Sequence, residues 1–249
     1  MSPALELSGV TVRFGDVIPV CDIDLRVEQG EQVVLLGPSG AGKSTLLNLA
    51  AGRVSPTSGE VVAFGRRWSD LRPGPARVLR RRVAVIHQQL DLVPVLRVVH
   101  NVNAGRLGSW STARTLRSLV RPVEVDEARR SLEAFGLDDR LMERTDRLSG
   151  GEQQRVAVAR ALRQRADLTL ADEPISAVDP TWRQRVLDLL VADAATRGAT
   201  LVVSSHDTAL ALERVPRAIG IKAGRIVFDQ LSSTLQTEQL DDLYGAVTR

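Results

Sequence analysis

One stretch of the sequence decides the fold of this chain: Gly37-Pro38-Ser39-Gly40-Ala41-Gly42-Lys43-Ser44-Thr45. It fits the pattern G-x-x-x-x-G-K-[ST], and it follows an apolar run at residues 33–36. Leucines at 46, 47 and 49 then begin an apolar-periodic stretch, which is typical of a helix. The loop therefore lies between a predicted buried strand and a predicted helix, the setting in which this pattern binds phosphate groups.

Each residue type in this loop has a physical task at a phosphate group. Glycines let the backbone wrap closely round the phosphates with successive N–H groups pointing inward, and the following helix adds its positive N-terminal end. We expect Lys43 to reach the β- and γ-phosphates and the Ser44 hydroxyl to ligate Mg²⁺. An ordinary turn before a helix is the alternative interpretation. The strand, the spacing, the Lys-Ser pair and the helix together favour a nucleoside triphosphate site.

The composition sets limits on the class of protein. With 249 residues the chain is long enough for one α/β domain or two small ones, and 43% hydrophobic content is typical of a soluble globular protein. No apolar run approaches the ~20 residues that cross a bilayer, and the first residues lack the pattern of a secretory signal. The single cysteine, Cys21, fits a reducing cytosol.

Charge gives a second limit. The net charge of +3 carries no strong signal for a nucleic-acid partner. Nearly all of the positive charge is arginine, since Lys43 and Lys222 are the two lysines of the sequence. A compact ammonium on a flexible stem suits a phosphate loop, so a lysine at position 43 supports a functional role there.

The order of the apolar runs predicts the fold class. Strand patterns open the chain, with turns expected at Gly9 and Gly15, and a hairpin is expected within residues 53–67. From about residue 94 to 165 the pattern turns helical. Further strands are predicted at residues 83–86, 168–171, 200–203 and 218–221, and a helix at residues 181–197. Alternating strands and helices imply a mostly parallel sheet covered by helices, in one compact domain with a helical insertion.

Two carboxylates end one of these predicted strands. Asp172 and Glu173 follow the apolar residues 168–171, so they are expected at the edge of the sheet. Asp172 is placed to hold Mg²⁺, directly or through water, and Glu173 to polarise an attacking water as general base. Taken alone, a strand that ends in Asp-Glu is a common solvated edge. A phosphate loop in the same chain favours the catalytic interpretation.

A third element precedes a long helical run. Ser149-Gly150-Gly151-Glu152 stands before the apolar-periodic residues 156–162, so its serine and glycines are expected at a helix N-terminus, where anions bind. Simple helix capping, with the glycines as a turn, is the alternative. A second phosphate site makes sense if it serves a nucleotide that another subunit holds.

The segment Leu148-Ser149-Gly150-Gly151-Glu152-Gln153 resembles the signature motif of ATP-binding cassette (ABC) proteins. As in that family, it lies between the phosphate loop and the Asp-Glu strand, and the resemblance extends over nearly the whole chain. It implies an α/β fold with a RecA-like P-loop NTPase core, an N-terminal antiparallel β subdomain and a helical subdomain near residues 90–163, all in one ABC domain at residues 1–249. It also implies ATP and Mg²⁺ as cofactors and an active ATPase.

The resemblance assigns roles to further residues. Phe14 stands where the family has an aromatic residue that stacks on adenine, Gln88 matches a glutamine that senses Mg²⁺ and the attacking water, and His206 matches a histidine that contacts the γ-phosphate. The expected catalytic residues are Glu173, His206 and Gln88, and the expected Mg²⁺ ligands are Ser44, Gln88 and Asp172. The expected nucleotide-binding residues are Phe14, Gly37, Pro38, Ser39, Gly40, Ala41, Gly42, Lys43, Ser44, Thr45, Ser149, Gly150, Gly151, Glu152 and Asp179.

The resemblance also implies a working pair of subunits. Each would hold ATP on its own loop and present Ser149-Gly150-Gly151 to the γ-phosphate of its partner, so that a homodimer closes on ATP and opens after hydrolysis. The pair would lie on the cytoplasmic face of the inner membrane as a peripheral protein, docked to transmembrane permease subunits. An extracytoplasmic substrate-binding protein would take part indirectly, and no nucleic acid is expected.

Finer features resemble the ATP-binding subunit of phosphonate importers. Residues 101–108 with Trp110 are similar to that subfamily, and so is the C-terminal part, where residues 224–229 are followed later by Leu240, Leu243, Tyr244 and Gly245. His87 where Phe is usual, and residues 230–232 where Gly-Pro is common, are departures. The implied cargo is a phosphonate or a related phosphorus oxyanion, phosphite or phosphate. An exporter or a lipid- or lipoprotein-releasing complex is the alternative, followed by an ABC ATPase outside transport.

Overall fold

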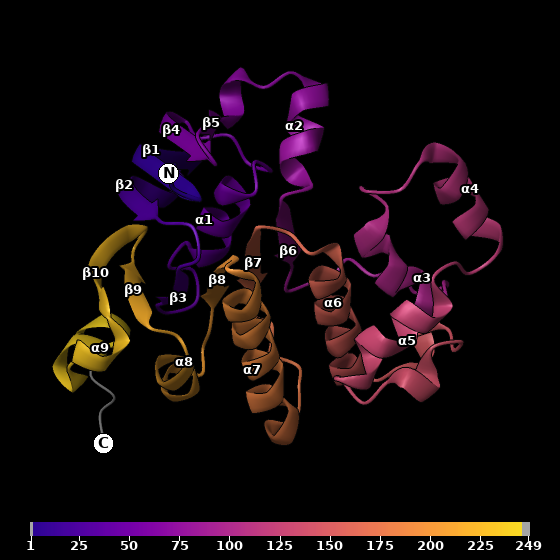
Figure 1. Ribbon diagram of the computed structural model, residues 1–249. Coiled ribbons are helices and arrows are strands. Elements are labelled where there is room, and N and C mark those ends of the chain that lie inside the picture. The colour runs from indigo at the N-terminus through magenta and orange to yellow at the C-terminus, as the bar shows by residue number, and fades with distance from the viewer. Residues whose placement is uncertain (1, 246–249) are drawn as a thin grey trace.

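The computed structural model describes residues 2–245, with the backbone alone described at positions 119 and 120. Its centre is a six-stranded sheet with the order β10-β9-β3-β8-β7-β6. The strands from β9 to β6 run parallel, and β10 pairs antiparallel with β9 at the edge. These strands are β3 Gln32–Leu36, β6 Val83–Ile86, β7 Leu168–Asp172, β8 Thr200–Ser204, β9 Arg217–Lys222 and β10 Arg225–Leu231 (Figure 1).

Both faces of the parallel part of the central sheet are buried, which explains why its parallel strands read as nearly continuous apolar runs. In β3, Val34 and Leu36 belong to one core, called here the first core, whereas Val33 and Leu35 belong to a second core on the other face. Helices α6 (Gly150–Gln164), α7 (Pro180–Arg197) and α8 (Thr208–Arg214) pack in the first core, and α1 (Lys43–Ala50) packs in the second. The arrangement confirms the predicted α/β class.

An antiparallel sheet with the order β2-β1-β4-β5 completes the second core. Its strands are β1 Leu5–Phe14, β2 Val17–Val27, β4 Ser58–Ala63 and β5 Arg66–Arg67. The chain turns at Gly15 as expected, but the turn expected at Gly9 is wrong. Gly9 lies inside β1 with φ of 57°, where the register against β2 shifts between Leu7 and Val10. The extra residue forms a β-bulge, and a bulge, like a turn, uses the positive φ of glycine.

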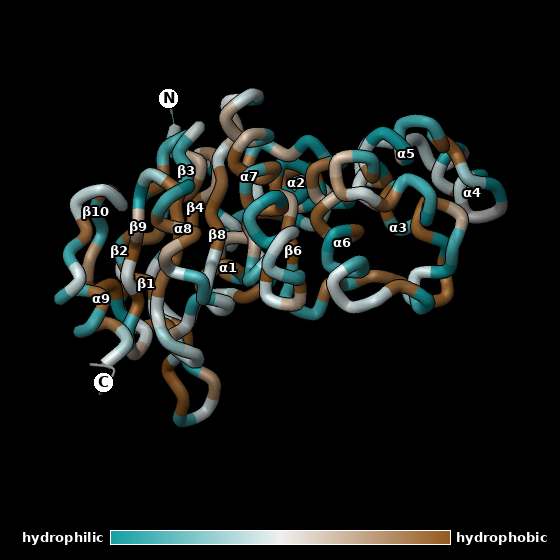
Figure 2. The backbone as a smooth tube through the Cα atoms, turned by 90° about the horizontal axis from the view of Figure 1, so that it is seen from below, coloured by the Kyte–Doolittle hydropathy of each residue, from teal (hydrophilic) through white to brown (hydrophobic). Residues whose placement is uncertain are grey.

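The segment between β6 and β7 forms helices. These are α3 Val98–Asn103, α4 Thr112–Val120, α5 Val125–Glu133 and α6, with 3-10 turns at Ala104–Arg106, Asp138–Arg140 and Thr145–Arg147. Buried side chains of α3, α5 and α6 extend the first core into this segment. Figures 1 and 2 show α4 and α5 at one end of an elongated molecule, with β10 and the C-terminal helix at the other end.

The remaining elements lie beside the two sheets. They are α2 Pro73–Arg80, α9 Thr237–Tyr244 and the 3-10 turns Trp68–Asp70 and Ser232–Thr234. The tube in Figure 2 is brown along much of the central sheet and more often teal around α4 and α5, as expected for a buried sheet and a solvated helical end. Within residues 2–245, no helix has both the length and the apolar content that crossing a bilayer requires.

The strand that carries the phosphate loop should be essential for stability. Leu35→Ala in β3 removes buried methyl groups from the second core and should lower the free energy of unfolding by about 2–5 kcal/mol. Leu116→Ala, at a position on α4 that is 59% exposed, is the matched control and should change it by less than about 0.5 kcal/mol. Urea unfolding followed by circular dichroism measures both. Equal midpoints for the two variants would contradict the two-core packing.

Candidate functional site

Four loops meet at one edge of the central sheet because its parallel strands are in register. β3 pairs with β8 at Leu35 and Ser204, and β8 pairs with β7 at Ser204 and Asp172. β7 pairs in turn with β6 at Ala171 and Ile86. The loops that follow β3, β6, β7 and β8 therefore leave the sheet at one level. This edge, at the carboxyl ends of parallel strands, is where open α/β sheets bind ligands.

Two glycines make the curvature of the phosphate loop possible. Gly37 has φ of 149°, and a Cβ atom there would lie 2.1 Å from the carbonyl oxygen of Ile221. Gly42 has φ of 105°, and a Cβ atom there would lie 2.0 Å from the carbonyl oxygen of Pro19. A side chain at either position would displace neighbouring backbone. The path of the loop between β3 and α1 therefore requires glycine at both positions.

The ammonium group of Lys43 lies inside this loop. Lys43 is 5% exposed, and its Nζ donates hydrogen bonds to the carbonyl oxygens of Gly37 at 2.6 Å and Pro38 at 3.1 Å. Burial lowers the pKa of Lys43, while the carboxylates of Glu173 and Asp172 act in the opposite direction. The loop, its lysine and the two carboxylates thus form one electrostatic unit.

The outer side of the loop faces solvent. Ser39, Gly40 and Ser44 are exposed, and a Cβ atom at Gly40 would meet nothing within 4 Å. The first N–H groups of α1 have no partner within the helix and carry its positive partial charge. An exposed glycine-rich loop at the start of a helix fits a phosphate group.

Glu173, His206 and Gln88 come together next to this loop. Oε1 of Glu173 lies 2.6 Å from Nε2 of His206, and Nε2 of Gln88 donates to Oε2 of Glu173 at 3.4 Å. The three side chains come from the loops after β7, β8 and β6. The carboxylate of Glu173 is 13% exposed, and its residue has a positive φ of 50°, which is unusual for a residue with a side chain. The surrounding hydrogen bonds hold this backbone conformation.

Ser204 connects the carboxylate of Asp172 to the backbone of Glu173, although no sequence pattern singled it out. Its Oγ donates to Oδ1 of Asp172 at 2.7 Å and accepts the N–H of Glu173 at 3.0 Å. Asp172 is 6% exposed, so this bond satisfies a buried carboxylate that would otherwise be costly. A small polar residue at the end of the apolar run 200–203 is the signal that could have indicated it.

Gln154 is a second residue to which the sequence pattern assigned no role. It is buried in α6, and its Nε2 donates to the carbonyl oxygen of Glu173 at 2.8 Å. Its Oε1 accepts the N–H of Ala177 at 2.8 Å. One side chain therefore ties α6 to both ends of the loop that follows β7.

The Ser149 segment forms a capping box at the start of α6. Oγ of Ser149 accepts the N–H of Glu152 at 3.3 Å, and the N–H of Ser149 donates to the Glu152 carboxylate at 2.8 Å, which lowers the pKa of that carboxyl. Ser149 and Gly150 are exposed, whereas a Cβ atom at Gly151 would lie 3.1 Å from the carbonyl oxygen of Ala177. The structure does not join this segment to the phosphate loop of the same chain, because α6 and α1 pack on opposite faces of the sheet.

Asp179 and Phe14 lie at the surface. Oδ1 of Asp179 accepts the N–H of Trp182 at 3.3 Å and so caps α7. Phe14 ends β1 and is 55% exposed. Their expected contacts with a nucleotide stay predictions.

A cavity of about 650 Å³ adjoins the Glu173 carboxylate. It is lined by Glu173, Ile175, Ser176, Arg183, Ser205, His206, Asp207, Thr208 and Ala209. Its position at the carboxyl edge of the sheet, and the contact between Glu173 and His206 in its lining, make it the candidate functional site.

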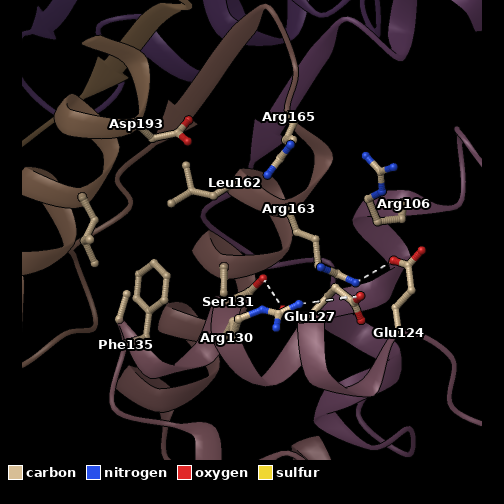
Figure 3. Close-up of a pocket in the computed structure, with 13 residues that line it drawn as sticks. Arg106, Glu124, Glu127, Arg130, Ser131, Phe135, Leu162, Arg163, Arg165 and Asp193 are labelled. Atoms are coloured by element: carbon tan, nitrogen blue, oxygen red, sulfur yellow. Dashed lines mark hydrogen bonds and ion pairs between the residues drawn. The ribbon is translucent and has the colours of Figure 1, made fainter. Parts of the chain in front are cut away.

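Another cavity, of about 530 Å³, lies between α5, α6 and α7 (Figure 3). Its charged side chains largely pair with one another or with neighbours. Arg163 lies 2.7 Å from Glu124 and Arg130 lies 3.7 Å from Glu127, whereas Asp193 is held by Arg197 outside the cavity. None of the expected site residues lines this cavity, whereas the expected catalytic residues Glu173 and His206 line the cavity of about 650 Å³, so the carboxyl edge of the sheet remains the candidate site.

Comparisons with known proteins agree with this geometry. A family model described as ABC transporter matches residues 20–176. The phosphonates import ATP-binding protein PhnC of Pseudomonas putida is 44% identical, covering 97% of this chain and 90% of that protein, and PhnC 2 of Pseudomonas aeruginosa is 45% identical, covering 97% and 91%. A solved dimeric ATP-binding cassette bound to ADP and phosphate, in a post-hydrolysis state, has a TM-score of 0.79 at 30% identity, covering 92% of this chain and 98% of that one. This chain therefore belongs to the ABC transporter family, as one of its ATP-binding cassette ATPases.

Proposed function

We propose that this chain is the ATP-hydrolysing motor subunit of an importer for phosphonate or a related phosphorus oxyanion, such as phosphite or phosphate. One observation carries the hydrolytic part of the proposal: the Glu173 carboxylate lies between His206 and Gln88, at the sheet edge that bears the phosphate loop. The cargo part rests on the two Pseudomonas proteins named for phosphonates import, which are 44% and 45% identical to this chain.

In the proposed reaction, the Glu173 carboxylate takes a proton from the water that attacks the γ-phosphorus, while the bond from that phosphorus to the β–γ bridging oxygen breaks and ADP leaves. The hydrogen bond from Gln88 orients the carboxylate for this step, and the contact with His206 holds it in place before ATP binds. The exposed ring of His206 turns to donate a hydrogen bond to the γ-phosphate. Lys43 exchanges its bonds to the loop carbonyls for bonds to the β- and γ-phosphates.

The residues at the carboxyl edge of the sheet suit Mg²⁺ that is bound together with the phosphates of ATP. They do not suit a metal ion whose ligands all come from the protein. Within residues 2–245, no group of three or more histidine, cysteine or acidic residues could hold a metal ion. Mg²⁺ is usually held by one or two protein oxygens together with waters and substrate phosphates. We assign Ser44, Gln88 and Asp172 as its ligands. When bound, Mg²⁺ neutralises negative charge on the phosphates.

The nucleotide site is proposed to be shared between two copies of the chain. Phe14 would stack on the adenine of a nucleotide held by residues 37–45, and Ser149 to Glu152 with Asp179 of the second copy would complete the site. The exposed start of α6 and its packing on the face opposite α1 support this division. The similarity to a dimeric cassette with bound ADP and phosphate supports the same pairing.

A membrane partner would dock on the surface that follows Gln88. Val93, Val95 and Leu96 are large apolar side chains that are exposed there. Exposed apolar side chains that follow Gln88 in the chain suit a transmembrane permease subunit. We propose that residues 1–249 form one ABC domain, with a helical subdomain near 90–163. The permease would hold this domain on the cytoplasmic face of the membrane. An extracytoplasmic binding protein would deliver the cargo to the permease.

Glu173→Gln keeps the size of the side chain but removes the general base. ATP turnover should fall by about 10²–10⁴-fold, whereas ATP binding and ATP-dependent dimers should remain. Phosphate release and size-exclusion chromatography with ATP measure the two properties. Glu133→Gln, at an exposed position of α5, is the matched control and should keep wild-type turnover. Loss of ATP binding in Glu173→Gln would count against the assigned role.

A mixture of two inactive variants tests the shared site. Lys43→Ala removes the phosphate loop lysine, and Ser149→Arg blocks the exposed start of α6, so either variant alone should be inactive. In a mixed dimer, the Ser149→Arg copy supplies an intact Lys43 and the Lys43→Ala copy supplies an intact Ser149. These two halves form one complete site. Random mixing should therefore restore about a quarter of the wild-type sites, measured as ATP turnover. An inactive mixture that still forms dimers would show that each chain works alone.

The cargo is tested with the complete transporter in vesicles. The complex of this chain with its permease subunits should hydrolyse ATP faster when the external binding protein carries a phosphonate, phosphite or phosphate than when it is empty. Sulfate is the matched anion control and should give no stimulation. Stimulation by a lipid or lipoprotein presented without a binding protein would instead favour the export alternative.

A further inference from the structure

The C-terminal helix reaches the phosphate loop through a single hydroxyl group. The phenol oxygen of Tyr244, in α9, accepts the N–H of Gly37 at 3.2 Å, and Oγ1 of Thr208 donates to it at 3.1 Å. Gly37 is the first residue of the loop, and Thr208 is the first residue of α8, two positions after His206. The hydroxyl of Tyr244 therefore joins the start of the loop to the start of the helix that follows the histidine.

Contacts outside the site fix the position of Tyr244. Leu243 is buried in the first core, and the ammonium of Lys222 donates to the carbonyl oxygen of Asp242. The side-chain amides of Gln230 and Gln239 exchange hydrogen bonds of 3.1 and 3.2 Å between β10 and α9. Figure 1 shows α9 against β9 and β10. The helix is thus held by the sheet edge, and its hydroxyl is a fixed point for the two loops.

The bridge touches the phosphate loop from its inner side. Gly37 is pressed against β9 at Ile221, whereas the exposed side of the loop is formed by residues farther along, so the Tyr244 contact leaves the phosphate-binding side unchanged. On the other side, Thr208 lines the cavity that also holds Glu173 and His206. The hydroxyl therefore contacts both the part of the site that binds ATP and the part that cleaves it.

The segment between His206 and Thr208 is short and internally bonded. Oγ of Ser205 accepts the N–H of Asp207 at 3.1 Å, and the Asp207 side chain caps α8 by accepting the N–H of Leu210 at 3.2 Å. A displacement of Thr208 would therefore carry His206 with it.

We propose that Tyr244 is a positioning residue for ATP hydrolysis: its hydroxyl holds the phosphate loop and the His206 segment in one fixed relation. The inference rests on the proposed ATPase function. Tyr244 acts through Gly37 and Thr208 and touches neither the nucleotide nor the attacking water. Because ATP binds on the other side of the loop, loss of the hydroxyl acts on the chemical step and leaves ATP affinity nearly unchanged.

Tyr244→Phe removes the hydroxyl and keeps the ring that packs against the first core. In the transporter complex, kcat for ATP should fall about tenfold while KM stays within about twofold, because misplacement of a catalytic group costs rate more than binding. Thr208→Val removes the other hydroxyl and should have the same effect. Thr208→Ser keeps a hydroxyl and should restore most of the rate. The double variant Tyr244→Phe with Thr208→Val should be no slower than either single variant, because both break one bridge.

A second readout does not depend on hydrolysis. Tyr244 is the one tyrosine in the sequence, so 3-fluorotyrosine labelling of the full chain gives a single fluorine resonance. Thr208→Val should shift this resonance, whereas Thr208→Ser should shift it little. An unshifted resonance in Thr208→Val, or a wild-type kcat in Tyr244→Phe, would overturn the inference. A joint loss of kcat, ATP affinity and thermal stability in Tyr244→Phe would instead mean a purely structural role, and it would overturn the inference as well.

The same experiments separate this inference from the proposed function. A wild-type complex that hydrolyses no ATP would contradict the proposed function, whatever the fluorine spectra show. Normal wild-type hydrolysis together with an unaffected Tyr244→Phe variant would contradict only the role of the hydroxyl.

Discussion

The parallel pairing of β3, β8, β7 and β6 is the constraint on which the rest of the site depends. Each of these strands ends in a loop with one chemical task, and no loop contains the whole site. The backbone hydrogen bonds of the sheet bring Asp172, Ser204 and the start of the phosphate loop to one level. A one-residue slip of β7 against β8 would turn the side chains of the slipped strand to the opposite face of the sheet and separate Glu173 from His206. The geometry of catalysis is thus set largely by secondary structure.

Much of this edge could be predicted from the sequence, because apolar runs that precede residues 37, 172 and 204 identify buried strands and parallel strands end at a common edge. The bulge at Gly9 could not be predicted from the sequence, since a bulge and a turn both require the positive φ of a glycine. The contacts of Ser204 and Tyr244 could not be predicted either. Their partners, such as Glu173 and Gly37, are far away in the sequence and become neighbours only through the register of the sheet and the docking of α9.

The start of α6 shows that one helix terminus can meet two demands. The capping box uses Oγ and the N–H of Ser149 together with the Glu152 side chain, which satisfies the helix within a single chain. Gly150 takes no part in the capping bonds, and it is exposed at the positive end of a long helix. Capping and anion binding were alternatives at the level of sequence, and the geometry of this terminus is compatible with both.

The double hydrogen bond of Gln154 has a consequence for how two bound nucleotides would influence each other. An amide is required there, because the side chain must donate to one backbone group and accept from another. In a dimer of the proposed kind, the N-terminus of α6 would contact the nucleotide of the opposite copy. Gln154, farther along the same helix, donates a hydrogen bond to the backbone of Glu173 in its own copy. Arrival of ATP in one site would then be transmitted as strain to the general base of the other. Such a linkage is a source of cooperativity that requires no contact between the two nucleotides.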